Sequence, residues 1–293
     1  MEQEKRRLGE RIEEAFEQIE SWSAESGVRL NLTKTAMVQF GRLNYDEDVH
    51  YRGEEIKFVN RVKYLGVVIS STLRFKDHIT HVEEKSAKII KLLHYANHLT
   101  GGLTISQKMI IYKQIWLPSV LYGRGVWFEK LPGYLRSRLH SVQRQMVLAM
   151  TGAFRTTNTA KLLNLLDILD VEREVQCLTE CRESEEDPKK IRQRYLEEQR
   201  SCTLGGYSSP FDIAQLRRKE PFWFITKHGP FRHHLAKMNK KHPSVCRFCV
   251  CRLEDADHLL HDCDELGPSH YTSIAEFEER CQAIARQIFS SGD

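Results

Sequence analysis

The sequence predicts a mainly α-helical protein of the α+β class, with a small antiparallel β element near the N-terminus and a small Cys/His-rich module near the C-terminus. Three observations support this fold class. Apolar residues recur at helical spacing along most of the chain. Short alternating apolar and polar runs are confined to residues 28–70. Four of the eight cysteines fall within residues 246–263.

The first predicted unit covers residues 1–75. One apolar stripe predicts a helix over residues 5–22, and Gly27 is placed to stop it. Alternation then predicts four short strands: residues 28–32, 37–40, 55–59 and 62–70.

A helical region is expected over residues 76–200. The period predicts a helix from about 76 to 98. Thr104 and Gln107 form a capping-box pattern for the next helix, which Pro118 should kink or end. The other helical patterns cover residues 135–146, with Gly152 as the stop, then residues 159–167 and 171–200, with a solvated charge run at 183–190.

A third unit is expected after a linker at residues 201–213, whose first part is rich in glycine and serine. Residues 214–293 would hold a basic arm, the Cys/His module and a terminal helix that uses Ile274, Phe277, Ile284 and Ile288.

Composition limits the class of protein. The chain has 293 residues, 41% of them hydrophobic, which is enough for a sizeable core. A net charge of +4 permits a nucleic-acid partner without requiring one.

No apolar run is long enough to cross a membrane, and the N-terminus has no signal-peptide core. We therefore expect an intracellular protein, nuclear or cytoplasmic and not secreted, with no membrane partner and with thiols rather than disulfides. The sequence indicates no oligomeric state.

The strongest chemical signal is the spacing C-x2-C-x8-H-x4-C formed by Cys246, Cys249, His258 and Cys263. Thiolates and imidazole in this spacing are typical ligands of a closed, tetrahedral structural zinc site. Cys251 could replace Cys249, and His261 could replace His258. The competing interpretation is reduced cysteines in an ordinary core. Because four protein ligands leave no position for water, we predict structural and not catalytic Zn²⁺.

A basic arm at residues 214–247 precedes this cluster, with nine Lys or Arg and one acid, Glu220. Cations interleaved with aromatic rings favour single-strand binding. An amphipathic helix with a buried aromatic edge explains the same pattern. The candidate nucleic-acid contacts in the arm are Arg217, Arg218, Lys237, Lys240 and Lys241.

Several catalytic patterns are absent from the sequence. It has no P-loop, no complete dinucleotide fingerprint and no recognisable hydrolase constellation. Asp46 and Asp48 lie in a polar loop, and we interpret them as surface charge. We therefore expect no catalytic residue in the chain, because phosphoryl transfer by two metals needs converging carboxylates.

Motifs in one order along the chain resemble the reverse transcriptases of non-LTR retrotransposons, the jockey-like elements and the arthropod elements that insert in ribosomal DNA. Residues 27–40 (GVRLNLTKTAMVQF) are similar to the motif that follows the catalytic strand in that family. Residues 62–68 (VKYLGVV) and 75–78 (FKDH) resemble its primer grip and the start of its thumb. The thumb motifs continue through residues 121–127, 143–144 and 155–157, and the cysteine cluster is similar to the family's C-terminal zinc region.

This resemblance implies the end of a palm, a thumb-like helical domain and a zinc-bound tail of an RNA-directed DNA polymerase. It implies RNA and DNA as partners, with contacts at Tyr64, Leu65 and Gly66. Lys34 matches the lysine of the post-catalytic motif. The family's aspartate pair would lie upstream of Met1, so we expect these residues alone to be inactive and Mg²⁺ to belong to the full-length enzyme. The alternative is a host protein that kept the zinc module for protein–protein interaction.

Overall fold

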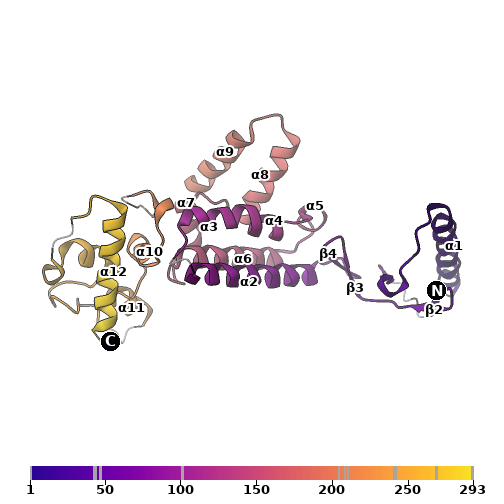
Figure 1. Cartoon of the computed structure of the whole chain (residues 1–293), viewed down its shortest axis with the longest axis horizontal. Helices are drawn as coiled ribbons and strands as arrows, with labels where there is room; N and C mark the ends of the chain where they lie inside the picture. The colour runs from indigo at the N-terminus through magenta and orange to yellow at the C-terminus, as the bar shows by residue number, and fades with distance from the viewer. Residues whose placement is uncertain are drawn as a thin grey trace. The chain divides into compact units, whose positions relative to one another are not determined.

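The computed structural model describes residues 2–41, 45, 48–99, 102–203, 205–207, 209, 211–239, 243–267 and 270–291. Within these ranges the chain is mainly helical, with two small antiparallel sheets of two strands each (Figure 1), which confirms the predicted fold class. The contacts divide the chain into two compact units. The first contains Met1–Val82 and Tyr122–Leu135, and the second contains Glu83–Leu121 and Arg136–Asp293.

The first unit begins with a long helix, as predicted. Its elements are the helix α1 (Glu2–Ser26), the 3-10 turn η1 (Leu32–Lys34), the hairpins β1 (Val49–Tyr51)–β2 (Glu54–Ile56) and β3 (Arg61–Tyr64)–β4 (Val67–Ser70), and the short helix α5 (Arg124–Trp127). Phe16 of α1 packs on Tyr51 of β1, with ring centroids 5.0 Å apart. The amphipathic stripe of α1 therefore contacts the first hairpin through Phe16.

The predicted strands at residues 28–32 and 37–40 are wrong. Asn31 organises a turn there instead: its carbonyl accepts from Lys34 N at 3.1 Å and from Thr35 Oγ1 at 2.9 Å. Its side chain also accepts from Thr33 Oγ1 at 2.7 Å. Such local bonds compete with a strand ladder, and Met37 forms only an isolated bridge to Phe58.

The strand predicted at residues 62–70 is a hairpin, β3–β4, because the chain reverses at Leu65 and Gly66. Both have positive φ, 45° and 85°, as the tight turns of hairpins require. Gly66 is also needed for space, since a Cβ there would lie 2.9 Å from the Tyr122 ring. The segment expected to pair with residues 62–70 contributes β2, which pairs with β1 instead.

The second hairpin is held by aromatic residues of the same unit. Trp127 is fully buried and donates from Nε1 to the carbonyl of Tyr122 at 2.9 Å. Its ring lies 5.1 Å from that of His78, whose Nδ1 accepts from Val68 N at 3.2 Å. The hairpin is therefore attached to a buried Trp/His pair.

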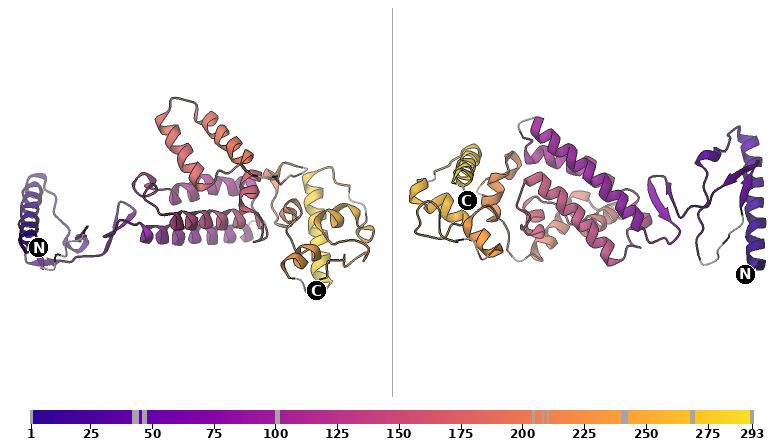
Figure 2. Two further views of the ribbon diagram at one scale, coloured as in Figure 1. Left: turned by 180° about the vertical axis from the view of Figure 1, so that it is seen from behind. Right: turned by 90° about the horizontal axis from the view of Figure 1, so that it is seen from below.

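Helices dominate the second unit, and α2, α3 and α6 run beside one another in every view (Figure 2). In order, the elements are α2 (Lys76–Leu99), α3 (Ile105–Ile111), the π turn η2 (Tyr112–Trp116), α4 (Leu117–Val120), α6 (Gly133–Thr151), α7 (Thr159–Leu165), α8 (Val171–Glu183), α9 (Pro188–Ser201), η3 (Ile213–Gln215), α10 (Glu220–Thr226), α11 (Arg232–Met238), η4 (His258–Asp262), η5 (Asp264–Leu266) and α12 (Ile274–Ser290). The boundary between the units falls within α2 and α6.

Capping explains several helix limits. The predicted capping box of α3 is present: Gln107 N donates to Thr104 Oγ1 at 3.2 Å, and Thr104 N donates to Gln107 Oε1 at 2.9 Å. The π turn η2 precedes Pro118, which has no amide hydrogen, and the helix ends at Val120. Gly152, with φ of 64°, follows α6 as predicted.

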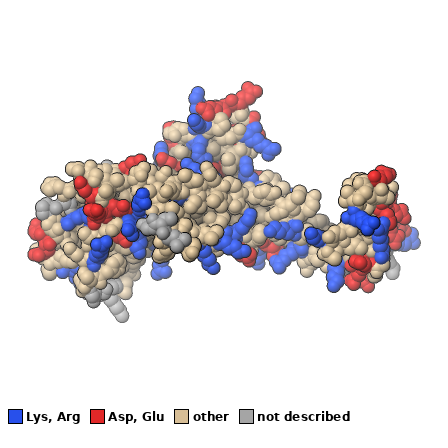
Figure 3. Space-filling view, viewed as in Figure 1, with Lys and Arg blue, Asp and Glu red and all other residues tan. Residues whose placement is uncertain are grey.

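The helical stretch predicted at residues 171–200 is two helices, α8 and α9. Pro188 is the first residue of α9 and restricts the residue before it, and Asp187 caps the helix by accepting from Lys189 N at 2.9 Å. The intervening charge run is exposed, as predicted. Positive and negative side chains are intermixed on the helical hairpin formed by α8 and α9 (Figure 3), and Arg194 forms ion pairs with Glu180 and Glu186.

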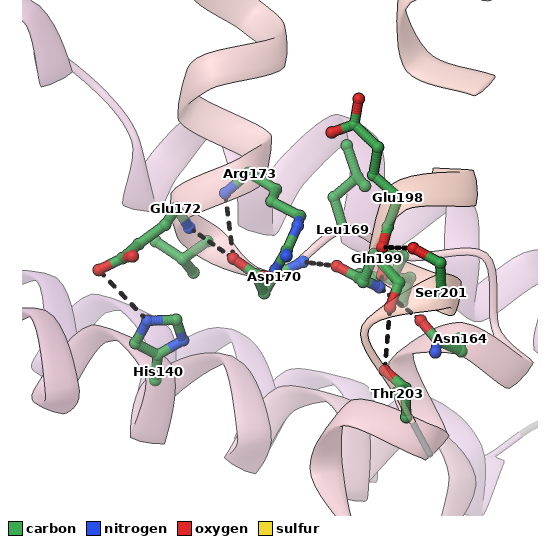
Figure 4. Close-up of polar contacts among 12 residues, drawn as sticks. His140, Asn164, Leu169, Asp170, Glu172, Arg173, Glu198, Gln199, Ser201 and Thr203 are labelled. Atoms are coloured by element: carbon green, nitrogen blue, oxygen red, sulfur yellow. Dashed lines mark hydrogen bonds and ion pairs between the residues drawn. The ribbon is translucent and has the colours of Figure 1, made fainter. Parts of the chain in front are cut away.

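Gln199 joins three of these helices (Figure 4). Its Nε2 donates to Asn164 Oδ1 at 2.7 Å and to the carbonyl of Ile168 at 2.9 Å, and its Oε1 accepts from Asp170 N at 2.7 Å. Asp170 in turn caps α8 by accepting from Glu172 N at 3.1 Å. Because Gln199 is 4% exposed, these bonds hold α7, α8 and α9 together away from water.

The C-terminal part of this unit contains the arm and the cysteine cluster. Ile105 N donates to the carbonyl of Leu216 at 2.8 Å, so the start of the arm is bonded to the start of α3. The predicted terminal helix is α12, with Phe277, Ile284 and Ile288 buried. Among the helices in the described ranges, none combines the length and apolar character needed to cross a bilayer.

Candidate metal centre and nucleic-acid contacts

Two of the predicted ligands lie on a short hairpin. Val245 and Leu253 form an antiparallel bridge, and Cys246 N donates to the carbonyl of Arg252 at 2.8 Å. The chain turns through Val250, whose φ is 57°. This tight reversal places the side chains of Cys246 and Cys249 together, as a C-x2-C pair requires.

The other two ligands lie at the two ends of η4. His258 is its first residue, and its amide donates to Asp255 Oδ1 at 2.9 Å. Cys263 follows the last residue of the turn. Leu259 and Leu260 are buried between them, so the apolar packing of the turn sets the direction of both ligands.

The four ligand atoms all lie within 4.8 Å of one another. The sulfurs of Cys246 and Cys263 are 3.9 Å apart, and Cys249 Sγ is 3.3 Å from His258 Nε2. A tetrahedron with zinc–sulfur bonds of about 2.3 Å and a zinc–nitrogen bond of about 2.0 Å has edges of about 3.8 Å and 3.5 Å. The cluster can therefore hold a metal ion.

Two further observations test this fit. Nε2 is the ring nitrogen of His258 that faces the cluster, and among the described residues Nδ1, on the other side of the ring, is buried without a hydrogen-bond partner. The thiols are also unequal. Burial raises the pKa of Cys246 to about 12, whereas the backbone amide of Cys251 lowers the pKa of Cys249 to about 6.

The alternative ligands lie outside the cluster. Cys251 is exposed, and its thiol donates to the carbonyl of Cys249 at 2.9 Å. His261 is exposed too, with Nε2 3.3 Å from the Tyr271 hydroxyl. The structure thus brings together Cys249 and His258 rather than their alternatives.

The aromatic rings of the basic arm are buried. Phe222, Trp223, Phe224 and Phe231 are each at most 5% exposed. They are not available to stack on bases in this conformation, and they form the buried aromatic edge of the second interpretation.

The cations of the arm have different surroundings. The side chain of Arg247 is 5% exposed and paired with Glu254, and Lys227 is paired with Asp257 at the surface. Arg217 and Arg218 are exposed and line a cavity, and Lys237 is exposed on α11. Lys240 and Lys241, like Asp46, lie outside the described residues.

The candidate contacts in the first unit are surface residues. Tyr64 and Leu65 are 63% and 74% exposed at the tip of the β3–β4 hairpin, next to Gly66. Lys34 is exposed in the turn η1. These residues belong to the first unit, and the arm belongs to the second.

Sequence reasoning missed Lys108, which is 4% exposed in a cavity of the second unit. A signal was present in the sequence. Ile105, Tyr112 and Trp116 form an apolar stripe at helical spacing, and Lys108 occupies the position between the first two. A lysine inside such a stripe indicates a buried charge.

Comparisons with known proteins identify relatives from one class of mobile element. The chain is 28% identical over 146 residues to a 115 kDa protein of the type-1 retrotransposable element R1DM of Drosophila melanogaster, covering 49% of this chain and 14% of that protein. It is 26% identical over 312 aligned residues to a Pol polyprotein of element R1 3 of Nasonia vitripennis, covering 88% and 80% of the two. It is 25% identical over 143 residues to the RNA-directed DNA polymerase of the mobile element jockey of Drosophila melanogaster, covering 48% and 16%.

The chain therefore spans less than a fifth of two of these relatives and most of the third. No family model and no solved structure matches it. The resemblance drawn from the motifs is confirmed by these relatives. The homologues of this chain are RNA-directed DNA polymerases and Pol polyproteins of non-LTR retrotransposons of the R1, jockey and X-element kinds, which is consistent with a reverse transcriptase region.

Proposed function

We propose that this chain is a nucleic-acid-binding region of a retrotransposon RNA-directed DNA polymerase, with a tail folded around structural zinc, and that these 293 residues do not polymerise DNA by themselves. The similarity to one Pol polyprotein covers 88% of the chain. The likeness therefore extends far beyond the cysteine cluster, which favours the polymerase over a host protein that kept only a zinc module.

The kind of site that the described residues offer supports the proposed inactivity. Two-metal phosphoryl transfer uses carboxylates that converge on Mg²⁺. In the part of the chain that the structure describes, the one group able to hold a metal contains cysteines and a histidine and no carboxylate. Mg²⁺ would be a cofactor of the full-length polymerase.

Zinc would be held by Cys246, Cys249, His258 and Cys263. When bound, it supplies four strong bonds that cross-link the cysteine hairpin to η4. The surrounding module is small, and Cys246, His258 and Cys263 are at most 5% exposed. Its role would therefore be to order the tail and not to activate water.

The observation that supports strand binding best is the tip of the β3–β4 hairpin. Tyr64 and Leu65 are largely exposed although one is aromatic and the other aliphatic. The turn beneath them is held in place, because Gly66 lies against the Tyr122 ring and Val67 is buried. A supported loop that presents apolar side chains to solvent is suited to contact the bases and sugars of a primer or template.

Fluorescence anisotropy with short single-stranded RNA and DNA tests this proposal. We expect measurable affinity at low salt, with log K falling linearly as log salt rises. Tyr64→Ala combined with Leu65→Ala should weaken binding about tenfold, since one stacked base contributes about 1–3 kcal/mol. Tyr134→Ala is the matched control, because Tyr134 is a similarly exposed tyrosine of the same unit.

Two outcomes would contradict the proposal. Failure of the unmodified chain to bind either strand at low ionic strength would remove the binding role. Templated, Mg²⁺-dependent nucleotide incorporation by the purified 293 residues would remove the inactivity.

A further inference from the structure

A basic cavity lies in the unit formed by Glu83–Leu121 and Arg136–Asp293. It is a cavity of about 450 Å³ between α2, the start of α3, the end of α6 and the beginning of the arm. The charged residues that line it are Lys108, Arg217, Arg218, Lys219 and Glu220, and His94 and His98 of α2 join them.

Lys108 is the unusual member of this set. It is 4% exposed, on the same face of its helix as the fully buried Tyr112 and Trp116. No described residue forms an ion pair or a hydrogen bond with its ammonium group, although Glu278 is close enough to raise its pKa. Burial has the larger effect and lowers the pKa of Lys108 to about 8. A buried ammonium without a direct partner is costly, and a bound anion would compensate it.

The carboxylates nearby are fewer than the cations that line the cavity. Glu278 uses Oε1 to accept from the backbone amides of Arg217 and Arg218, at 2.9 and 2.6 Å. This carboxylate thus holds the arm backbone in place, while Arg217 Nη1 donates to the carbonyl of Gly102 at 3.4 Å. Glu220 also lines the cavity, and among the described residues its Oε2 is buried without a partner. Four cations against this one acid leave the lining positive, even with both histidines neutral.

The cavity is built into the fold. Ile105 N is bonded to the carbonyl of Leu216, which fixes the arm at the helix that carries Lys108. On the opposite side, Gly152 has φ of 64°, and a Cβ there would collide with the Cβ of Lys219. Trp223 Nε1 donates to the carbonyl of Gly152 at 3.1 Å, and the Lys219 ammonium lies 5.4 Å from the Trp223 ring centroid.

We propose that this cavity binds a backbone phosphate of a nucleic-acid strand, with Lys108 as the buried positive charge and Arg217, Arg218 and Lys219 as surrounding donors. Guanidinium groups bond phosphate oxygens in pairs, and an ammonium acts on them as a point charge. The volume is that of a small-molecule pocket and accommodates a phosphate together with its sugar. This assignment rests on the proposed function, because it identifies a place where the bound strand is held.

The test compares four single variants in the anisotropy experiment. Lys108→Met and Arg218→Gln each remove one cation from the cavity, and Lys108→Arg restores the charge. Arg286→Gln removes an exposed arginine of α12 that does not line the cavity. Circular dichroism and thermal melting establish that each variant is folded.

We expect Lys108→Met and Arg218→Gln each to weaken strand binding about fivefold to twentyfold and to lower the salt slope by about 1, as loss of one phosphate contact should. Lys108→Arg should retain most of the affinity, and Arg286→Gln should behave as the unmodified chain. Should Arg218→Gln and Lys108→Met bind like the unmodified chain while the Tyr64/Leu65 variant is weakened, the cavity assignment is wrong and the proposed function stands.

Other outcomes are equally decisive. No binding by the unmodified chain removes the proposed function itself, and this inference with it. A thermal shift with inorganic phosphate that Lys108→Met abolishes, with unchanged strand binding, would show a free-phosphate site and overturn the assignment to a strand.

Discussion

Arg247 and Glu254 form a two-bonded ion pair from which solvent is almost excluded, with side chains 5% and 0% exposed. Arg247 Nε donates to Oε2 at 2.8 Å, and Nη2 donates to Oε1 at 2.7 Å. Glu254 also accepts from Arg232 N at 2.8 Å, and Arg247 donates to the carbonyl of Ile288 at 3.1 Å. The pair therefore connects the cysteine hairpin to α11 and α12.

Breaking this pair should destabilise the tail strongly. Glu254→Ala leaves the Arg247 charge buried without its partner, and we expect a loss of about 3–5 kcal/mol in the free energy of unfolding. The control is Asp257→Asn, which breaks the exposed pair with Lys227 and should change stability by less than about 1 kcal/mol. Urea unfolding of the zinc-loaded protein measures both. Equal effects of the two substitutions would show that Glu254 does not have this role.

The cysteine cluster predicts a simple metal stoichiometry. Protein purified with zinc should contain about one ion per chain by elemental analysis, and Cys246→Ser should lose most of it because one of four ligands is removed. Cys251→Ser should retain the metal, since Cys251 points away from the cluster to the carbonyl of Cys249. Metal lost from Cys251→Ser and kept by Cys246→Ser would reassign the ligands.

The buried Lys108 predicts a pH dependence of stability. The folded-state pKa is lowered to about 8 by burial, whereas the unfolded chain keeps an ordinary lysine value of about 10.4. Between these values the unfolded chain binds more protons, so this group makes the free energy of unfolding rise with pH from about 8 to 10.4. Below about 8 the destabilisation is fully present.

Lys108→Met removes this contribution. Without nucleic acid, the variant should be more stable than the unmodified chain at pH 7 by about 1–2 kcal/mol. This difference is smaller than the full pKa shift would give, because solvent screens part of the lysine charge. The difference should shrink as the pH approaches 10. Denaturant unfolding at several pH values measures it, and a difference that grows with pH would have the wrong sign for a buried ammonium.

Gln199 should be required for the packing of α8 and α9. Gln199→Leu leaves the carbonyl of Ile168 and the amide of Asp170 without their partner, in a place where the side chain is 4% exposed. We expect a loss of about 2–4 kcal/mol, because each unsatisfied buried group costs about 1–3 kcal/mol. Gln193→Leu, at an exposed position of α9, is the matched control and should change stability little. Comparable losses at both positions would refute the role of Gln199.

Long periodic segments were predictable from the sequence because their signals are local. The stripe of α1, the capping box at Thr104 and the stop at Gly152 each depend on residues within a few positions of one another. The strands were not predictable in the same way. Alternation in residues 28–40 is compatible with a strand, but Asn31 offers its backbone neighbours a closer set of hydrogen bonds.

The candidate metal ligands were also predictable, since their spacing in a small module restricts which side chains can meet. The packing of the basic arm was not predictable from the sequence. The pattern of its rings and cations is equally compatible with a surface that binds a nucleic-acid strand and with one edge of a hydrophobic core. Burial of Phe222 and Phe231, and the pairing of Arg247 with a glutamate seven residues away, depend on packing that no local pattern specifies.

By itself, the sequence determined the helical class, the main helix starts and stops, the Cys/His set and the relationship to retrotransposons. These features depend on the spacing of residues close together in the chain or on the order of motifs. Only the tertiary structure decided which of the many charges are buried, because burial depends on segments distant in the chain. Lys108 and Arg218 are more than a hundred positions apart in the chain and line the same cavity, where Ile105 N is hydrogen-bonded to the carbonyl of Leu216. The free-energy cost of burying a charge depends on the groups packed around it in the fold and not on its neighbours in sequence.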